Sequence, residues 1–105
     1  DFWILDHRNH RLQQFDAKGN FKNHIGKCGL EAGELYLPES VAGFSDGMLV
    51  ISQGHLNRSL KLFTPDGVES GYLQLEYAPG GMLVLDNKLI VTRFDGSAFH
   101  VYERL

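Results

Sequence analysis

The sequence has little of what marks several large classes of protein. Among its 105 residues there is a single cysteine, Cys28, so an internal disulfide is excluded. The longest apolar runs, Met48 to Ile51 and Met82 to Leu85, are far shorter than the ~20 residues that a membrane-spanning helix needs. No membrane partner is therefore expected. A lone cysteine is also typical of a reducing compartment, which favours a cytoplasmic location.

The chain also lacks a strong net charge of either sign. It carries 10 Lys and Arg against 13 Asp and Glu, a net charge of -3, which argues against a uniformly basic surface for nucleic acid. The charges are nevertheless unevenly distributed, since residues 7–27 are mainly basic and residues 31–46 are acidic. The alternative interpretation of this pattern is an ordinary solvated surface of mixed charge.

No segment shows a helical period with capping residues. Instead, short apolar runs rich in branched and aromatic side chains stand between turn signals, which is typical of buried strands. Three of these runs are Phe2 to Leu5, Met48 to Ile51 and Leu89 to Val91. Sequences such as Pro65-Asp66-Gly67 supply the backbone angles of tight turns. The sequence therefore predicts an all-β protein.

The chain contains an internal repeat. Residues 9–16 align with residues 57–64, and more weakly with residues 96–103. The anchoring aromatic residues Phe15, Phe63 and Tyr102 lie 48 and 39 residues apart, with the longer spacing explained by an inserted loop from Lys27 to Glu39. These spacings are close to the roughly 40 to 50 residues of a four-stranded propeller blade. We therefore expect each repeat to be one blade.

This repeat predicts a partial β-propeller of about 2.5 blades of four-stranded antiparallel sheet. Labelling the strands of a blade a to d, we expect strands b to d in residues 1–26, a complete blade in residues 40–75, and strands a to c of a last blade in residues 82–105. Propellers close as rings of typically four to eight blades. We therefore expect the chain to be completed by further blades upstream or to self-associate.

The first repeat carries the most specific motif. Its residues are Asp6-x-x-Asn9-His10-Arg11-Leu12-x-x-Phe15-Asp16-x-x-Gly19-x-Phe21-x-x-x-Ile25-Gly26, followed by Gly29, Gly33, Leu35 and Pro38. This pattern resembles the NHL repeat, which builds β-propellers. The second repeat keeps Asn57, Phe63 and Pro65-Asp66-Gly67, but it has Ser52 at the expected Asp position, and the third is degenerate. Decay of the third repeat is typical of a terminal blade.

Among NHL proteins, the chain looks most like the C-terminal blades of a TRIM-NHL protein. The resemblance implies a recognition module that binds a protein partner or substrate, with single-stranded RNA as a further ligand, in a TRIM-type ubiquitin ligase. The alternative that it leaves open is a dedicated RNA-binding propeller in post-transcriptional regulation. Ligase activity would belong to a RING domain outside this segment, because the zinc sites of that domain need several cysteines.

Catalysis by the segment itself is not expected. His7 and His10 are three residues apart, but further metal ligands are remote in sequence, so the repeat explains Asn9-His10-Arg11 better as a loop whose polar side chains satisfy the backbone. Cys28 has no catalytic frame, and Ala78-Pro79-Gly80-Gly81 is interpreted as a turn rather than a phosphate-binding loop. No catalytic residue, metal ligand or cofactor is assigned.

Binding is therefore the expected function. The resemblance implies that the b–c and d–a loops gather on one face of the ring, and they supply the candidate binding residues Arg8, His55, Asn57, Arg58, Arg93 and Phe94. Arg93-Phe94 offers a cation for phosphate and an aromatic ring for base stacking. The alternative is that Phe94 packs against the neighbouring blade and Arg93 pairs with Asp95. His55 and Asn57 could likewise read a base edge or only shape their loop.

Overall fold

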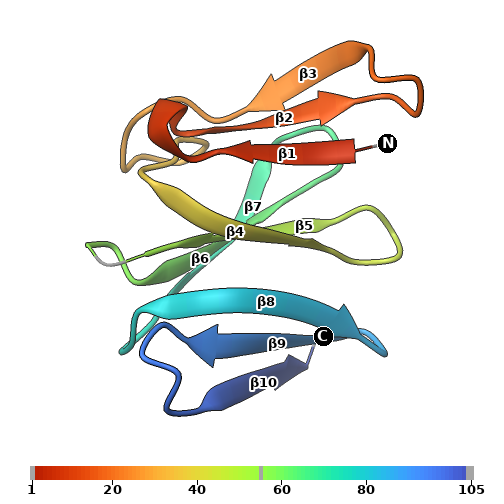
Figure 1. Cartoon of the computed structure of the whole chain (residues 1–105). Helices are drawn as coiled ribbons and strands as arrows, with labels where there is room; N and C mark the ends of the chain where they lie inside the picture. Colours follow the sequence, from red (N-terminus) through yellow and green to blue (C-terminus); the bar gives the residue numbers. More distant parts are fainter. Residues whose placement is uncertain (1, 55, 104–105) are drawn as a thin grey trace.

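Strands account for almost all of the regular structure. The structure, a computed structural model, describes residues 2–54 and 56–103, and within these it contains ten β-strands and one turn of 3-10 helix (Figure 1). The elements are β1 (Phe2–Asp6), η1 (His7–Asn9), β2 (Arg11–Phe15), β3 (Phe21–Ile25), β4 (Pro38–Gly43), β5 (Leu49–Gln53), β6 (Ser59–Phe63), β7 (Glu69–Gln74), β8 (Pro79–Leu85), β9 (Lys88–Arg93) and β10 (Phe99–Glu103). The all-β prediction is confirmed.

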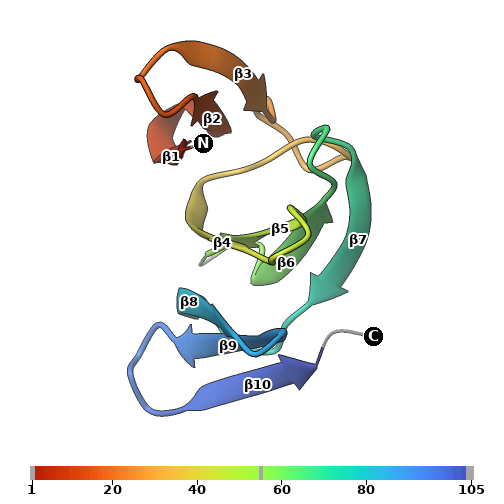
Figure 2. The ribbon, with the colours of Figure 1, turned by 90° about the vertical axis from the view of Figure 1, so that its right-hand side faces the viewer.

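In the described part of the chain the strands form three antiparallel sheets. The first has the order β1-β2-β3, the second β4-β5-β6-β7 and the third β8-β9-β10. The sheets follow one another along the molecule, with β4 and β8 on one side and β7 on the opposite side (Figure 2). Sheets of three and four strands arranged in this way are those of a partial propeller, which confirms the predicted fold class.

Strands β4 and β8 begin earlier than the sequence analysis predicts. β4 starts at Pro38, inside the predicted inserted loop, and β8 starts at Pro79, so the interpretation of residues 78–81 as a turn is wrong. The reason lies in the pairing with β9, which is irregular between Pro79 and Met82. The Thr92 hydroxyl accepts a hydrogen bond from the Gly81 N–H at 2.9 Å, and a Cβ on Gly80 would lie 2.8 Å from that oxygen. The two glycines therefore accommodate a bulge within the strand.

Strands β5 and β6 of the second sheet are buried on both faces. Leu49 and Ile51 of β5 face the first sheet and join a core with Leu12, Ile25, Leu35 and Phe63. Val50, between them, faces the third sheet and joins a core with Phe44, Leu60, Leu75, Tyr77, Leu89 and Val91. Successive residues of a strand point to opposite faces, so one short apolar run supplies both cores. This explains why β5 reads as a continuous apolar run rather than an alternating one.

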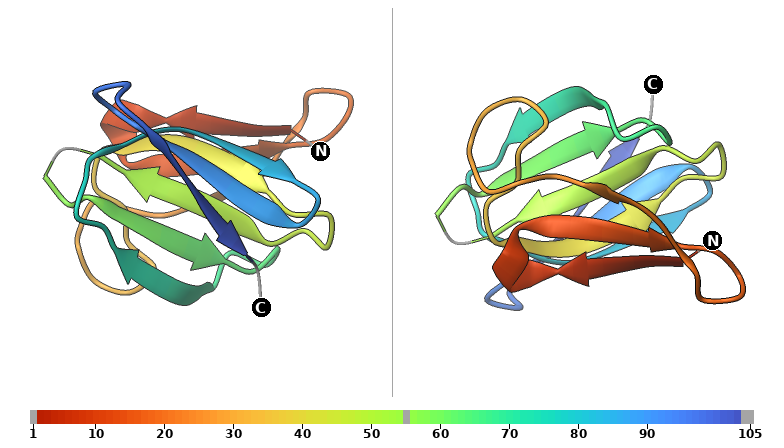
Figure 3. Two further views of the ribbon diagram at one scale, coloured as in Figure 1. Left: turned by 90° about the horizontal axis from the view of Figure 1, so that it is seen from below. Right: turned by 90° about the horizontal axis from the view of Figure 1, so that it is seen from above.

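The outer faces of the first and third sheets are open in the described structure. The first sheet is outermost in the view from above and the third in the view from below (Figure 3). Large apolar side chains on these faces are each at least 50% exposed, namely Phe2, Ile4, Phe21, Leu83, Leu85, Phe99 and Val101. Monomeric soluble proteins rarely expose large contiguous apolar surfaces. These two faces are therefore suited to packing against another apolar surface.

Candidate recognition site

The loops that join strands b and c lie at one end of the molecule. They are the β1–β2, β5–β6 and β9–β10 loops, and they lie on the left of Figure 1, opposite the β2–β3, β4–β5 and β8–β9 turns. This end carries five of the predicted binding residues, namely Arg8, Asn57, Arg58, Arg93 and Phe94. The sixth, His55, lies outside the described residues. The shared location follows from the propeller order of the strands, because equivalent loops of successive blades emerge at the same end.

The first of these loops is fixed by its own polar side chains. The Asp6 carboxylate accepts hydrogen bonds from Asn9 Nδ2, at 3.0 Å to each oxygen, and from Arg11 Nε at 3.1 Å. The hydrogen bond from the Asn9 side chain, followed by the hydrogen bond and the positive charge of Arg11, lowers the pKa of Asp6. Asn9 and Arg11 therefore satisfy a carboxylate rather than the backbone, which differs from the sequence-based interpretation. Arg11 is committed to this ion pair.

Two histidines tie this loop to the connection between β3 and β4. His10 Nδ1 accepts a hydrogen bond from the Leu37 N–H at 2.9 Å, and its ring stacks on Tyr36 with the centroids 5.2 Å apart. His7 Nδ1 lies 2.8 Å from the Pro38 carbonyl oxygen, to which it donates. One nitrogen of each ring is thus engaged by the backbone. Among the described residues, no group of three or more His, Cys, Asp or Glu side chains is placed to hold a metal ion.

The buried side-chain amide of Gln53 links the β3–β4 connection to the second sheet. The Tyr36 N–H donates to Gln53 Oε1 at 2.7 Å, and Gln53 Nε2 donates to the Ser59 hydroxyl at 3.0 Å. Gln53 and Ser59 are almost fully buried. Tyr36 and Leu37 are therefore held between the second sheet and the first b–c loop.

A cavity of about 170 Å³ lies where these parts meet. Its lining residues come from the first b–c loop, the β3–β4 connection, the start of β4 and the second b–c loop: His7, Tyr36, Leu37, Glu39, Gly54, Leu56 and Asn57. Of the predicted binding residues, Asn57 lines this cavity. Arg8 and Arg58 are exposed and directly follow the lining residues His7 and Asn57 in the chain. The cavity thus has polar, aromatic and apolar residues in its lining, with two exposed arginines beside it in sequence.

Sequence reasoning missed Tyr36, Glu39 and Leu56 as members of the site. The sequence predicts an inserted loop around Tyr36 and an acidic stretch that includes Glu39. A signal for Glu39 does exist in the repeat, because Pro38-Glu39 aligns with Pro79-Gly80 at the start of the equivalent strand. Because one blade has a glutamate where the next has a glycine, the repeat itself does not require the Glu39 side chain, which indicates a separate role for it.

Arg93 and Phe94 belong to a different cluster, beside the third sheet. Arg93 Nε lies 3.8 Å from Asp95 Oδ1, and the guanidinium carbon is 5.2 Å from the centroid of the Tyr77 ring. Phe94 donates its backbone N–H to the Ala78 carbonyl at 2.8 Å, but its side chain is 57% exposed. The Arg93–Asp95 contact is thus the one foreseen in the alternative interpretation, whereas the Phe94 side chain is mostly accessible.

Tyr77 is the centre of that cluster. Its ring stacks on His100 at a centroid distance of 4.3 Å, and its hydroxyl is 2.9 Å from the hydroxyl of Tyr102. Burial, reinforced by the hydrogen bond with Tyr102, raises the pKa of the Tyr77 hydroxyl. Arg93 therefore contributes to packing of the third sheet, although its side chain remains about one-third accessible, at 35%.

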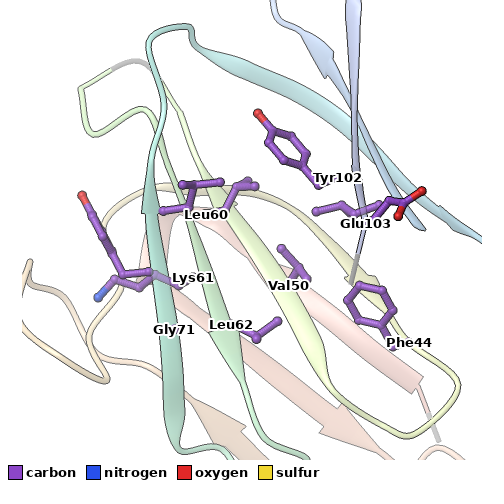
Figure 4. Close-up of a pocket in the computed structure, with 11 residues that line it drawn as sticks. Phe44, Val50, Leu60, Lys61, Leu62, Gly71, Tyr102 and Glu103 are labelled. Atoms are coloured by element: carbon purple, nitrogen blue, oxygen red, sulfur yellow. The ribbon is translucent and has the colours of Figure 1, made fainter. Parts of the chain in front are cut away.

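A larger groove of about 440 Å³ runs between the second and third sheets. Figure 4 shows Phe44, Val50, Leu60 and Tyr102 among its lining side chains, which come from both sheets. Most of the lining is apolar, and Lys61 there is ion-paired with Glu69. The groove continues the core between these sheets and brings together none of the predicted binding residues.

Cys28 is a free, exposed thiol. Over residues 2–54 and 56–103, no helix is long and apolar enough to cross a membrane.

Comparisons with known proteins agree with the fold. No protein-family model matches the chain. The chain is 29% identical over 68 residues to Protein brain tumor of Drosophila melanogaster, a match that covers 64% of the chain and 7% of that protein. This similarity supports an NHL-like β-propeller relationship.

Solved structures show the same architecture. A crystal structure described as that of an exported protein of Bacteroides fragilis superposes with a TM-score of 0.78 at 22% identity, covering 96% of this chain and 31% of the other. Saccharomyces cerevisiae Sqt1 superposes with a TM-score of 0.63 at 14% identity, covering 90% of this chain and 29% of the other. The chain thus spans about a third of each solved structure and a small part of Protein brain tumor.

Proposed function

We propose that this chain is part of a recognition propeller that binds a protein partner through the end bearing the b–c loops, with RNA as a second class of ligand. The similarity to Protein brain tumor supports a protein- or RNA-binding NHL module in general. The observation that carries the proposal is the cavity between the first two sheets, to which the first two b–c loops and the β3–β4 connection contribute. It is bordered by loops, which is where binding residues gather on rigid scaffolds.

The protein partner is favoured over RNA by charge. The chain has a net charge of -3 and its cavity contains the carboxylate of Glu39, neither of which favours a phosphate backbone. Arg8 and Arg58 are the observation that favours the alternative, a dedicated single-stranded RNA-binding propeller, because both are exposed at this end. Binding of RNA through them would weaken steeply as salt is raised.

The wider setting is proposed on the resemblance alone. A TRIM-type protein in the cytoplasm would use this propeller to select substrates, and ubiquitin-ligase activity would come from other domains. The open outer faces of the first and third sheets would pack against further blades or against a second copy of the chain, since their exposed apolar side chains match the buried faces of the second sheet.

Photo-crosslinking in cells tests the proposal. A photoreactive residue is placed at Arg58 of the full-length protein, and a second variant carries it at Lys18, an exposed position in the β2–β3 turn at the opposite end. Protein adducts formed from position 58 but not from position 18 are the expected result. Adducts to RNA alone, with binding to a random RNA pool that falls with salt and in Arg8→Ala and Arg58→Ala variants, would replace the proposal by its alternative.

A further inference from the structure

Glu39 occupies an irregular position at the start of β4. Pro38 pairs with Gln53 and Ser40 pairs with Ser52, so Glu39 is an extra residue with no partner on β5. Bulges of this kind re-aim a side chain and are common beside functional sites. Here the bulge brings Glu39 into the lining of the cavity between the first two sheets.

The fold of the strand does not require this carboxylate. In the third sheet Pro79 pairs with Arg93 as Pro38 pairs with Gln53, and the pairing is again irregular after the proline. The residue that follows Pro79 is Gly80. An equivalent irregular strand start therefore forms without a glutamate, so the side chain of Glu39 calls for a separate explanation.

The Glu39 side chain lies against the bare backbone of Gly54. A Cβ added to Gly54 would lie 2.7 Å from Glu39 Cγ and 2.8 Å from Glu39 Oε1. Any larger residue at position 54 would have to displace the glutamate. Within the part of the chain that the structure describes, the Glu39 carboxylate forms no hydrogen bond or ion pair. A partly buried carboxylate held in this way is an acceptor for a ligand.

The remaining walls suit the stem of a long side chain. Leu37 and Leu56 provide apolar surface, Tyr36 an aromatic ring and Asn57 an amide. Lys and Arg bury their methylene stems on apolar surface while the charged end binds a carboxylate or an aromatic face. The cavity of about 170 Å³ is also smaller than the roughly 300 to 1,000 Å³ of pockets for whole small molecules. Its volume therefore suits one inserted side chain.

We propose that this cavity binds one Lys or Arg side chain of the protein partner, with Glu39 as its counter-ion. The inference rests on the proposed function and adds the chemistry of the ligand. The other titratable lining residues are His7, whose Nδ1 is engaged by the Pro38 carbonyl, and Tyr36, whose ring stacks on His10. The exposed Arg8 and Arg58 lie outside this lining and would contact acidic residues that flank the inserted cation. The partner segment would then be of mixed charge.

The test uses a displayed library of random 12-residue peptides and the full-length protein. Wild type and Glu31→Gln, an equal loss of charge on an exposed residue that does not line the cavity, are expected to enrich peptides with Lys or Arg at one fixed position. Glu39→Gln is expected to lose that enrichment. Gly54→Ala should do the same while keeping the charge, because its methyl group displaces the carboxylate.

The selected peptide then gives a double-mutant cycle. Replacing its cation by citrulline or norleucine should weaken binding to wild type about tenfold or more, and should have little effect on binding to Glu39→Gln. A peptide that binds the loop end without needing a cation, or a cation whose loss costs the same in both proteins, would overturn the inference and leave the proposed function standing. Failure to enrich any peptide, with no protein adducts from position 58, would overturn both. Loss of RNA binding in Glu39→Gln would assign the cavity to a nucleotide instead.

Discussion

Lys61 and Glu69 form a buried ion pair across neighbouring strands. Lys61 Nζ lies 2.8 Å from Glu69 Oε1, with the two side chains 2% and 13% exposed. The same ammonium donates to the carbonyl oxygens of Glu31 and Glu34, each at 2.9 Å, and the Gly33 N–H donates to Glu69 Oε1. Hydrogen bonds of this number satisfy the charges that burial would otherwise penalise. The pair therefore fastens the loop between β3 and β4 onto the second sheet.

We expect Lys61→Met to be strongly destabilising. It would leave the Glu69 carboxylate without its counter-ion and two carbonyl groups without their donor, and removing one partner of a buried pair costs about 3–5 kcal/mol. The free energy of unfolding of the full-length protein, measured with urea, should fall by that amount. Hydrogen exchange should show faster exchange of amides in residues 26–37.

The matched control for this change is Lys88→Met. Lys88 lies 3.8 Å from Glu103 with the two side chains 50% and 71% exposed, and exposed pairs contribute at most about 1 kcal/mol. Equal losses in both variants would show that the buried pair does not hold the loop.

Substitution of Gly26 tests the geometry of the turn that leads from β3 into the β3–β4 loop. Its φ is +94°, and a Cβ there would lie 2.6 Å from Leu35 Cδ1 and 3.1 Å from the His10 carbonyl oxygen. Gly19 has a similar φ of +87° but no atom within 4 Å of the same added carbon. Both Gly→Ala variants should lose about 1–2 kcal/mol through backbone strain, and Gly26→Ala should lose more because of the clash. Thermal unfolding of the two variants measures the difference, and equal losses would contradict the contact with Leu35.

Much of the fold could be predicted because its determinants are local. Asp86-Asn87 predicts a hairpin, and both residues do have positive φ, 50° and 61°. The alternation in Leu49-Val50-Ile51 likewise follows from sheet geometry, since each strand residue faces one of two neighbouring sheets. The sequence does not indicate the start of β8, because Pro79-Gly80-Gly81 is typical of a turn and the bulge depends on pairing with β9 and on the Thr92 hydroxyl.

The candidate site was harder to predict because it depends on contacts between remote residues. Its loops could be located from the repeat, and Asn57 does line the cavity. Tyr36 reaches the cavity because contacts remote in sequence hold its loop, among them hydrogen bonds with His10 and Gln53 that span 27 and 17 residues. A single sequence carries no local signal for such contacts. The acidic, glycine-containing segment from Lys27 to Glu39 is therefore predicted to be an inserted loop.

Tyr77 should make the free energy of unfolding fall as the pH becomes alkaline. The pKa of its hydroxyl is raised above the ordinary value of 10.0, chiefly by burial. The folded state therefore keeps the proton that the unfolded state loses, so the stabilisation is complete below pH 10 and falls by about 1.4 kcal/mol per pH unit as pH rises above it. Urea unfolding between pH 8 and pH 11 should show this decline.

The Tyr77→Phe variant isolates the contribution of this hydroxyl. It should lower stability at neutral pH by about 1 kcal/mol, through loss of the hydrogen bond with Tyr102, and should flatten the alkaline decline. Tyr72→Phe, which changes a tyrosine that is 54% exposed, should leave the decline in place. If the free energy of unfolding of Tyr77→Phe still fell at alkaline pH as in the wild type, other groups would cause the decline.

The open outer faces predict how residues 1–105 behave when expressed alone. Leu83 and Val101 lie in one cross-strand row through Ile90, and Phe99 shares their face, so the third sheet presents a continuous apolar surface. Apolar surface of this kind is stabilised by removal from water, either by self-association or by a hydrophobic dye. We expect sedimentation velocity to show concentration-dependent oligomers, or dye fluorescence to rise on mixing.

Charge on that face should suppress both effects. Leu83→Lys combined with Phe99→Lys is expected to reduce oligomers and dye binding, because lysine at these positions opposes an apolar contact. Leu30→Lys changes an apolar side chain that is 64% exposed but lies in the loop after β3, and it should have little effect. A monodisperse monomer that binds no dye would contradict the proposal that these faces pack against another blade, and it would require the side chains of the outer sheets to rearrange when the segment stands alone.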